Sequence, residues 1–253
     1  MYVFGVQRYV LKNWIGETKE NKKWIFDRFC CLFPAKICNF VIVMADNYLE
    51  KRQEELAHAQ KKVVKRNHLS LDTLLHRNRS YRGFDAAVAV TEAQLRALVG
   101  VVPLVASGMN RQPLRFRLVS GADAARVHPL VTLGAALPQE HLPHPGMEPQ
   151  AYIVVCSAVP EDKVVDIDLG IAAQGMLLKA TEMGLGGIFI LNFRKEALRA
   201  ALDLPLEPLA VIGLGKPAET VFLVPGASPE ALTYYRRDGV HYVPKLAVDQ
   251  LIV

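Results

Sequence analysis

The sequence is poor in cysteine and has no long uninterrupted apolar run. Its four cysteines are Cys30, Cys31, Cys38 and Cys156. Their spacing fits neither a disulfide framework nor a zinc site, so we expect no metal and a chain kept in a reducing cytoplasm. Internal repeats and low-complexity stretches are also missing, which excludes solenoid and linker-like architectures.

Strong charge of one sign is missing from most of the chain. The net charge is +5, from 30 Lys/Arg and 25 Asp/Glu. Residues 1–43 hold seven of the basic and three of the acidic residues, which leaves 23 and 22 for the other 210 residues. The basic character therefore belongs mainly to the first segment, and no nucleic-acid partner is expected.

The first 43 residues differ in composition from the rest and allow three interpretations. The apolar stretch 29–43 is interrupted by Pro34 and Lys36, and it is shorter than the roughly 20 residues of a membrane-spanning helix. A signal peptide would need a small-residue cleavage site, which is not evident. Met44 as the true start, a membrane anchor and an ordered extension all stay open. We divide the chain into an atypical extension, 1–43, and a domain, 44–253, with no membrane partner expected.

Alternating helices and strands are expected along the domain. Ser70 and Thr91 are possible caps of helices over 69–77 and 91–102, and Asp168 is a possible cap of an apolar helix to about Met183 that ends at Gly184. Further helices are expected over 46–66, 122–136 and 194–202, and strands over 116–120, 152–157, 188–191 and 209–214. The tail 218–253 has little periodicity. This order predicts an α+β fold with a central sheet.

Two clusters carry groups that suit a ligand. Arg77, Arg79, Ser80 and Arg82 place three guanidinium groups and a hydroxyl within six residues, a composition that suits a phosphate, although a solvated charge run has the same composition. The second cluster consists of Ser107, Gly108, Asn110 and Gln112. Its small residues permit close backbone approach and its amides suit the polar edge of a planar heterocycle, although an ordinary turn before a strand would look alike.

Other motifs argue against a dinucleotide-binding turn, a metal site and a catalytic side chain. The glycines of Gly184-Leu-Gly-Gly187 follow a helix and lack the order of a dinucleotide-binding turn, so they predict a tight reversal into a strand. His141 and His144 lie among prolines without a third metal ligand, and Cys156 is expected to be a core thiol. Since the sequence also shows no catalytic triad or carboxylate pair, we expect no catalytic side chain.

Four motifs in order resemble the nitroreductase-like flavoproteins. They are RNRSYRGF (77–84), SGMNRQPLRF (107–116), DLGIAAQGMLLKATEMGLGGIFI (168–190) and LAVIGLGKPAE (209–219). The resemblance implies a central mixed or antiparallel sheet flanked by helices and an intertwined homodimer. It also implies FMN bound at the dimer interface.

The resemblance implies roles for particular residues. Arg79, Ser80 and Arg82 would hold the phosphate and ribityl end of FMN, with Asn78 standing where many members have another arginine. Residues of the second motif would approach the flavin, at least partly from the partner subunit: Ser107, Gly108, Asn110 and Gln112. Backbone groups near Leu191 and Asn192 would reach flavin N5. Arg236 is the candidate for a basic residue completing the phosphate site, with Lys216 and Arg237 as alternatives.

The expected activity is NADH- or NADPH-dependent reduction of nitroaromatic, quinone or related small-molecule acceptors, with the chemistry carried by the cofactor. Two alternatives remain open. One is a reductase or dehydrogenase of a specific metabolite on the same fold. The other is a flavin-binding protein that serves storage or sensing without useful turnover.

Overall fold

The computed structural model describes residues 69–253. The proposed boundary at Met44 and the expected helix over 46–66 therefore lie outside the described residues. The helices and strands are α4 (Leu71–Arg77), α5 (Glu92–Val99), β1 (Leu114–Ser120), α6 (Ala124–Val127), β2 (Ala151–Ser157), α7 (Lys163–Glu182), β3 (Gly186–Ile190), α8 (Lys195–Leu202), β4 (Pro208–Gly215), β5 (Val221–Pro225), β6 (Tyr235–Arg237) and β7 (Val240–Lys245).

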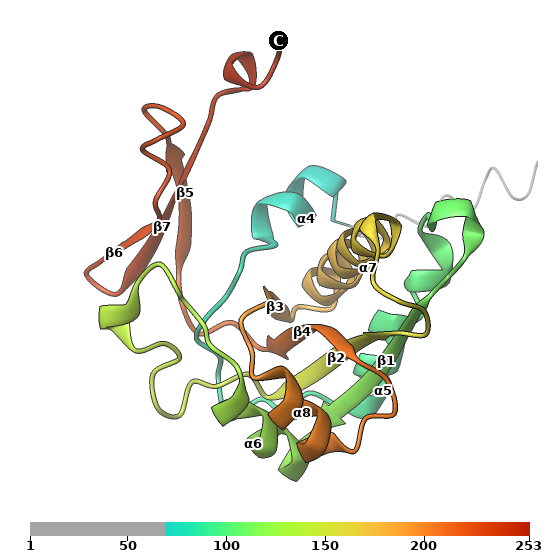
Figure 1. Ribbon diagram of the computed structural model, residues 1–253. Coiled ribbons are helices and arrows are strands. Elements are labelled where there is room, and N and C mark those ends of the chain that lie inside the picture. Colours follow the sequence, from blue (N-terminus) through green and yellow to red (C-terminus); the bar gives the residue numbers. More distant parts are fainter. Residues whose placement is uncertain (1–68) are drawn as a thin grey trace, which may run out of the picture. The chain divides into compact units, whose positions relative to one another are not determined.

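A four-stranded antiparallel sheet in the order β1-β2-β4-β3 forms the centre (Figure 1). Helix α7 lies over one face, and α6 and α8 lie over the other. Strand β2 is buried on both faces: Ile153 and Val155 pack into the core beneath α7, while Tyr152 and Val154 pack into the core beside α8. The α+β class predicted from the sequence is thus confirmed.

Local capping explains two of the helix starts. The Ser70 hydroxyl accepts a hydrogen bond from the Thr73 amide at 3.2 Å and begins α4. Thr91 and Gln94 form a reciprocal capping box at the start of α5, which satisfies two backbone amides that a helix end leaves unpaired. Both starts agree with the sequence, although α5 ends at Val99 rather than near Val102.

The start of α7 corrects one prediction. Asp162, not Asp168, caps this helix, because its carboxylate accepts hydrogen bonds from the Val164 and Val165 amides at 2.9 and 2.8 Å. Asp168 lies inside the helix and is 3% exposed. The predicted end is confirmed, since Gly184 adopts a left-handed φ of 74° just after the helix.

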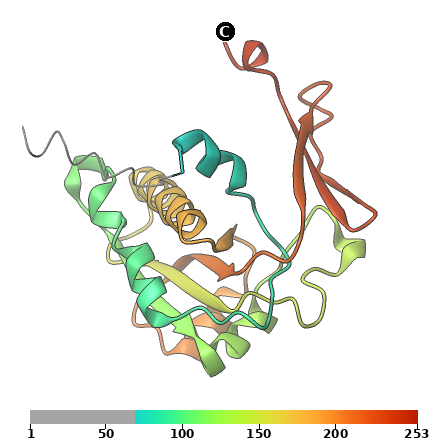
Figure 2. The same cartoon turned by 180° about the vertical axis from the view of Figure 1, so that it is seen from behind.

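One further prediction was wrong. The helix expected over 122–136 is reduced to the single α-turn of α6 with short 3-10 turns on either side, because Pro129 cannot donate a backbone hydrogen bond and Val131 pairs instead with Phe193. The tail 218–253, whose low periodicity indicated no particular element, forms a second sheet, β5-β7-β6, with one parallel and one antiparallel pairing. This C-terminal sheet stands beside the central one (Figure 2).

Candidate functional site

The segment 78–84 is held along β3. Ser80 forms a parallel bridge with Gly187, and the Tyr81 amide donates to the Gly187 carbonyl at 3.1 Å. A Cβ on Gly186 would lie 2.5 Å from the Tyr81 ring and from Pro217, so only glycine allows this approach. The glycines after α7 therefore bring the arginine-rich motif onto the edge of the sheet.

Arg82 enters a buried cluster formed with the C-terminal sheet. Its side chain is 8% exposed. Its Nη1 donates to the Ser80 carbonyl at 2.8 Å and lies 3.3 Å from His241 Nε2. Its guanidinium carbon lies 4.6 Å from the centroid of the Tyr234 ring, a cation–π contact. These contacts fix the orientation of the guanidinium group.

Glu219 ties the arginine motif to the C-terminal sheet. One carboxylate oxygen accepts hydrogen bonds from the Arg82 and Gly83 amides, and the other accepts from Arg236 Nη2. The side chains of Arg236 and Glu219 are only 8% and 4% exposed. A buried ion pair of this kind is strongly destabilised when one partner is removed, so Glu219 and Arg236 hold the cluster together.

Unsatisfied donors mark this cluster. Among the described residues, four buried side-chain nitrogens have no hydrogen-bond partner: Arg79 Nε, Arg82 Nε, Arg236 Nε and His241 Nδ1. Leaving a buried donor unpaired costs free energy, and native proteins rarely do so without a reason. Three of these nitrogens belong to arginines, whose forked donors match phosphate oxygens. The cluster therefore has the donors that an anion with several oxygens requires.

Arg79 and Ser80 border the cluster in different ways. The Arg79 guanidinium donates through Nη2 to the Leu75 carbonyl of α4, and burial lowers the pKa of this arginine. Ser80 is exposed and contributes its carbonyl to Arg82. Of the predicted phosphate residues, Arg82 and Arg236 are thus brought together through Glu219, while Arg79 and Ser80 flank them.

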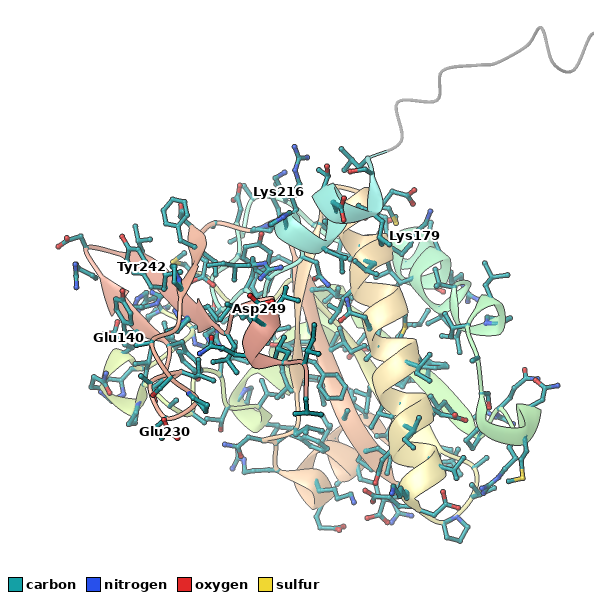
Figure 3. The ribbon with its side chains drawn as sticks, turned by 90° about the horizontal axis from the view of Figure 1, so that it is seen from above. Glu140, Lys179, Lys216, Glu230, Tyr242 and Asp249 are labelled. Atoms are coloured by element: carbon teal, nitrogen blue, oxygen red, sulfur yellow. The ribbon has the colours of Figure 1, made fainter. Side chains whose placement is uncertain are left out.

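The three basic candidates after β4 occupy different places. Arg236 lies within the buried cluster. Lys216 Nζ instead donates to the Gly184 carbonyl at 3.3 Å, and Figure 3 shows Lys216 away from Tyr242 of β7. Arg237 is exposed and lies 5.7 Å from the Tyr235 ring. Of these three side chains, Arg236 is the one that contacts Glu219 in the buried cluster. His144, which lies among the prolines of the loop before β2, reaches the edge of the cluster, with Nε2 3.5 Å from Arg236 Nη1.

The second predicted cluster is organised by Asp168. The Ser107 hydroxyl donates to Asp168 Oδ2 at 2.6 Å, and the Gly108 amide donates to Oδ1 at 2.8 Å. The Gln112 amide donates to Ser107 Oγ at 2.9 Å, and its side-chain Nε2 donates to Asn110 Oδ1 at 2.8 Å. All four predicted residues of this loop are therefore linked in one network.

The backbone of this loop is held in an uncommon conformation. Met109, Asn110 and Gln112 have left-handed φ angles of 51°, 55° and 47°, which non-glycine residues adopt only when their surroundings impose it. A Cβ on Gly108 would lie 2.3 Å from Val164 Cγ1, so the loop rests tightly on α7. The exposed amides of Asn110 and Gln112 are thereby ordered in advance of any ligand.

Leu191 and Asn192 directly follow β3, and Asn192 lines a cavity. Leu191 is 65% exposed, and the Asn192 carbonyl accepts a hydrogen bond from the Thr132 amide at 2.9 Å. The cavity has a volume of about 540 Å³ and is lined by Asn192 together with Thr132, Gly134 and His141. Asn192 thus lines a different cavity from the one that Ser107 and Gln112 line.

Four residues of the site were not identified as site residues from the sequence: Asp168, Glu219, Tyr234 and His241. Asp168 carried a signal, because a charged residue well inside an apolar helix must find partners when buried. The other three, Glu219, Tyr234 and His241, lie in the tail 218–253, where the sequence shows too little periodicity to predict strands. Their roles depend on pairing with residues more than 130 positions earlier in the chain.

Comparison with known proteins gives a consistent result. The sequence model of the nitroreductase family matches residues 75–216. No curated protein matches the chain. Among solved structures, a nitroreductase family protein from Streptococcus pneumoniae TIGR4 is 18% identical with a TM-score of 0.52, over 73% of this chain and 99% of that one. This similarity shows a shared fold, as the sequence predicted.

Two further structures give lower TM-scores. A nitroreductase family protein from Clostridium difficile 630 is 22% identical with a TM-score of 0.48, over 60% of this chain and 86% of its own. The FMN-dependent nitroreductase NfnB from Mycobacterium smegmatis, solved with NADPH, is 19% identical with a TM-score of 0.49, over 58% of this chain and 87% of its own. In the part of the chain described, no helix is long and apolar enough to cross a membrane.

Proposed function

Because the chain belongs to the nitroreductase family, we propose that it is an FMN-dependent oxidoreductase that uses NADH or NADPH to reduce nitroaromatic, quinone or related acceptors. The observation that carries the proposal is the set of buried, unpartnered guanidinium nitrogens on Arg79, Arg82 and Arg236. These are the arginines that the sequence resemblance assigns to the FMN phosphate. We also propose a cytoplasmic location, as the low cysteine content of the sequence predicts.

The phosphate end of FMN would bind at the Arg82 cluster. Arg82 and Arg236 carry two positive charges against the single negative charge of Glu219, so the cluster retains a positive charge for the phosphate. Glu219 and Tyr234 hold the two guanidinium groups in place, which reduces the ordering cost of binding. Arg79 and Ser80 would complete the site from the side of α4.

The flavin ring would be bound by polar groups rather than by a catalytic side chain. Asn110 and Gln112 present ordered amides for the pyrimidine edge, at least partly across a dimer interface, and backbone groups of Leu191 and Asn192 would lie near N5. When bound, FMN would supply the redox chemistry between NAD(P)H and the acceptor. The residues of the chain position the reactants.

A second copy of this chain would cover the apolar surface beside the Ser107 loop. Leu104 and Met109 are each 82% exposed, and Ile167 of α7 is 52% exposed. Large apolar side chains exposed close together mark interaction surfaces. Ala173 of the same helix is only 4% exposed and belongs to the core of its own chain, so a substitution there does not test a partner surface. The exposed Ile167 is the better position to test a homodimer. For Ile167→Arg, sedimentation should show a folded monomer with weakened FMN binding.

The phosphate assignment is tested by comparing FMN with riboflavin, which lacks the phosphate. Arg82→Ala should weaken FMN binding by roughly tenfold or more, since a hydrogen bond to a charged group contributes about 1.5–3 kcal/mol. Arg117→Ala on the exposed side of β1 is the matched control. Circular dichroism should confirm that both variants fold. Equal loss of FMN and riboflavin in Arg82→Ala would show that Arg82 does not act on the phosphate.

Turnover distinguishes an enzyme from a flavin-binding protein. The flavin-loaded wild-type protein should oxidise NADH or NADPH steadily when a nitroaromatic or quinone acceptor is added. A screen of acceptors would then identify the preferred class. Flavin that stays oxidised in the presence of both nicotinamide cofactors would contradict the enzymatic proposal and leave a binding role.

A further inference from the structure

His241 is a completely buried polar side chain in the Arg82 cluster. It is 0% exposed and lies on β7. The Tyr234 ring lies with its centroid 5.0 Å from that of the imidazole, and the His241 amide donates to the Thr220 carbonyl at 3.0 Å. The imidazole is thus fixed in position from the backbone and from one face of the ring.

The contact with Arg82 determines which ring nitrogen carries the proton. A guanidinium group can only donate hydrogen bonds. His241 Nε2, 3.3 Å from Arg82 Nη1, must therefore be the unprotonated acceptor. Burial, and the positive charges of Arg82 and Arg236, lower the pKa of His241 to about 4, so the ring is neutral near neutral pH. The single ring proton then resides on Nδ1.

Nδ1–H is consequently a buried donor without an acceptor. Among the described residues it has no hydrogen-bond partner, as is also true of Arg82 Nε and Arg236 Nε. A structural histidine of the core normally satisfies both nitrogens. A donor that remains unpaired beside two unpaired guanidinium nitrogens indicates a ligand with several acceptor oxygens.

We propose that His241 is a phosphate ligand of this site, whose Nδ1–H donates to an oxygen of the FMN phosphate beside Arg82 and Arg236. The inference rests on the proposed function, because it takes FMN as the ligand. It adds a neutral donor to the charged ones, so that the site recognises the phosphate by geometry as well as by charge. It also gives the C-terminal sheet two phosphate ligands, Arg236 from β6 and His241 from β7.

Two substitutions separate the nitrogens of the ring. In His241→Gln the longer amide occupies the place of Nε2 and can accept from Arg82, but nothing remains at Nδ1. In His241→Asn the shorter amide places a donor near Nδ1 and loses the acceptor for Arg82. His76→Gln, at an exposed position of α4, is the matched control. Affinities for FMN and for riboflavin are measured by quenching of flavin fluorescence.

Loss of the Nδ1 donor should weaken FMN binding specifically. We expect His241→Gln to lose roughly tenfold or more in FMN affinity, with riboflavin affinity unchanged, and His241→Asn to lose less. The opposite order, with His241→Gln like wild type, would overturn the inference and leave His241 as a residue that only positions Arg82. A wild-type protein that binds neither flavin would instead overturn the proposed function.

A measurement on the wild-type protein covers the case in which the variants do not fold. In nitrogen-15 spectra of histidine-labelled protein, one neutral imidazole should carry its proton on Nδ1 at pH 7. Its Nδ1–H signal should shift when FMN is added and stay in place when riboflavin is added. If no neutral Nδ1–H imidazole responds to FMN, the inference is wrong.

Discussion

Replacing Asp168 tests how the Ser107 loop is held. The Asp168 carboxylate accepts two hydrogen bonds, from the Ser107 hydroxyl at 2.6 Å and from the Gly108 amide at 2.8 Å. Asp168→Ala removes both and leaves two donors without an acceptor. Asp168→Asn keeps one acceptor oxygen but places an amide NH₂ against Ser107, whose oxygen already accepts from the Gln112 amide.

The expected loss of stability follows from these two bonds. A hydrogen bond to a charged group contributes about 1.5–3 kcal/mol, so the loss of two in Asp168→Ala should lower the free energy of unfolding by about 3–6 kcal/mol. Asp168→Asn should lower it by about 1–2 kcal/mol, because the bond from the Gly108 amide loses its charge assistance and the Ser107 hydroxyl must reorient. Against a total stability of about 5–15 kcal/mol, both losses are measurable by urea unfolding.

A neighbouring carboxylate provides the control. Asp166 lies on the same helix with its side chain exposed, and Asp166→Asn makes the same change of charge. Its effect should stay within about 1 kcal/mol, the size of a helix-dipole contribution. Hydrogen exchange at the Gly108 amide gives a local measure, since the amide should lose protection in Asp168→Ala. Unchanged protection together with a ΔΔG no larger than that of Asp166→Asn would refute this account of the loop.

Three further outcomes are expected. His241 has a folded-state pKa of about 4 and an ordinary value of 6.5. As the pH falls, this histidine is therefore protonated in the unfolded protein at a higher pH than in the folded protein. The FMN-free protein should therefore lose up to about 3 kcal/mol from this group as pH falls from 6.5 towards 4; a urea midpoint no more pH-dependent than that of His241→Gln would contradict this. Gly108→Ala should cost about 1–3 kcal/mol by overpacking against Val164, with part recovered by adding Val164→Ala. Arg236→Ala should destabilise more than Arg237→Ala by about 3–5 kcal/mol, because it leaves Glu219 buried and unpaired; similar midpoints for the two variants would show that the ion pair is not buried in solution.

Elements with a strong local signal were predicted correctly from the sequence. Ser70 and Thr91 are side-chain caps whose partners lie three residues away, and 152–157 is a short apolar run rich in β-branched residues, which is typical of a buried strand. Gly184 marks the end of α7 because a left-handed residue there favours glycine. In each case the interactions that decide the structure lie within a few residues of one another.

The errors arose where distant partners decide the structure. Strands β5 and β7 pair across the loop that contains β6. The residues of β5 do not alternate clearly between the two faces of the sheet, so the sequence gives no local signal of a strand there. Asp168 was taken for a cap because aspartate favours that position, whereas its partners are Ser107 and Gly108, sixty residues earlier. The same holds for the site: resemblance selected Arg82 and Arg236, but their joining through Glu219 depends on the tertiary fold.

The identity of the copurifying cofactor tests the central claim most directly. The purified protein should be yellow, and heat should release a flavin that chromatography identifies as FMN. The unpartnered donors of Arg79, Arg82 and Arg236 predict a phosphate-bearing flavin rather than riboflavin, and the family resemblance indicates FMN rather than FAD. A colourless protein that also fails to bind added FMN, or one that releases FAD instead, would contradict the account.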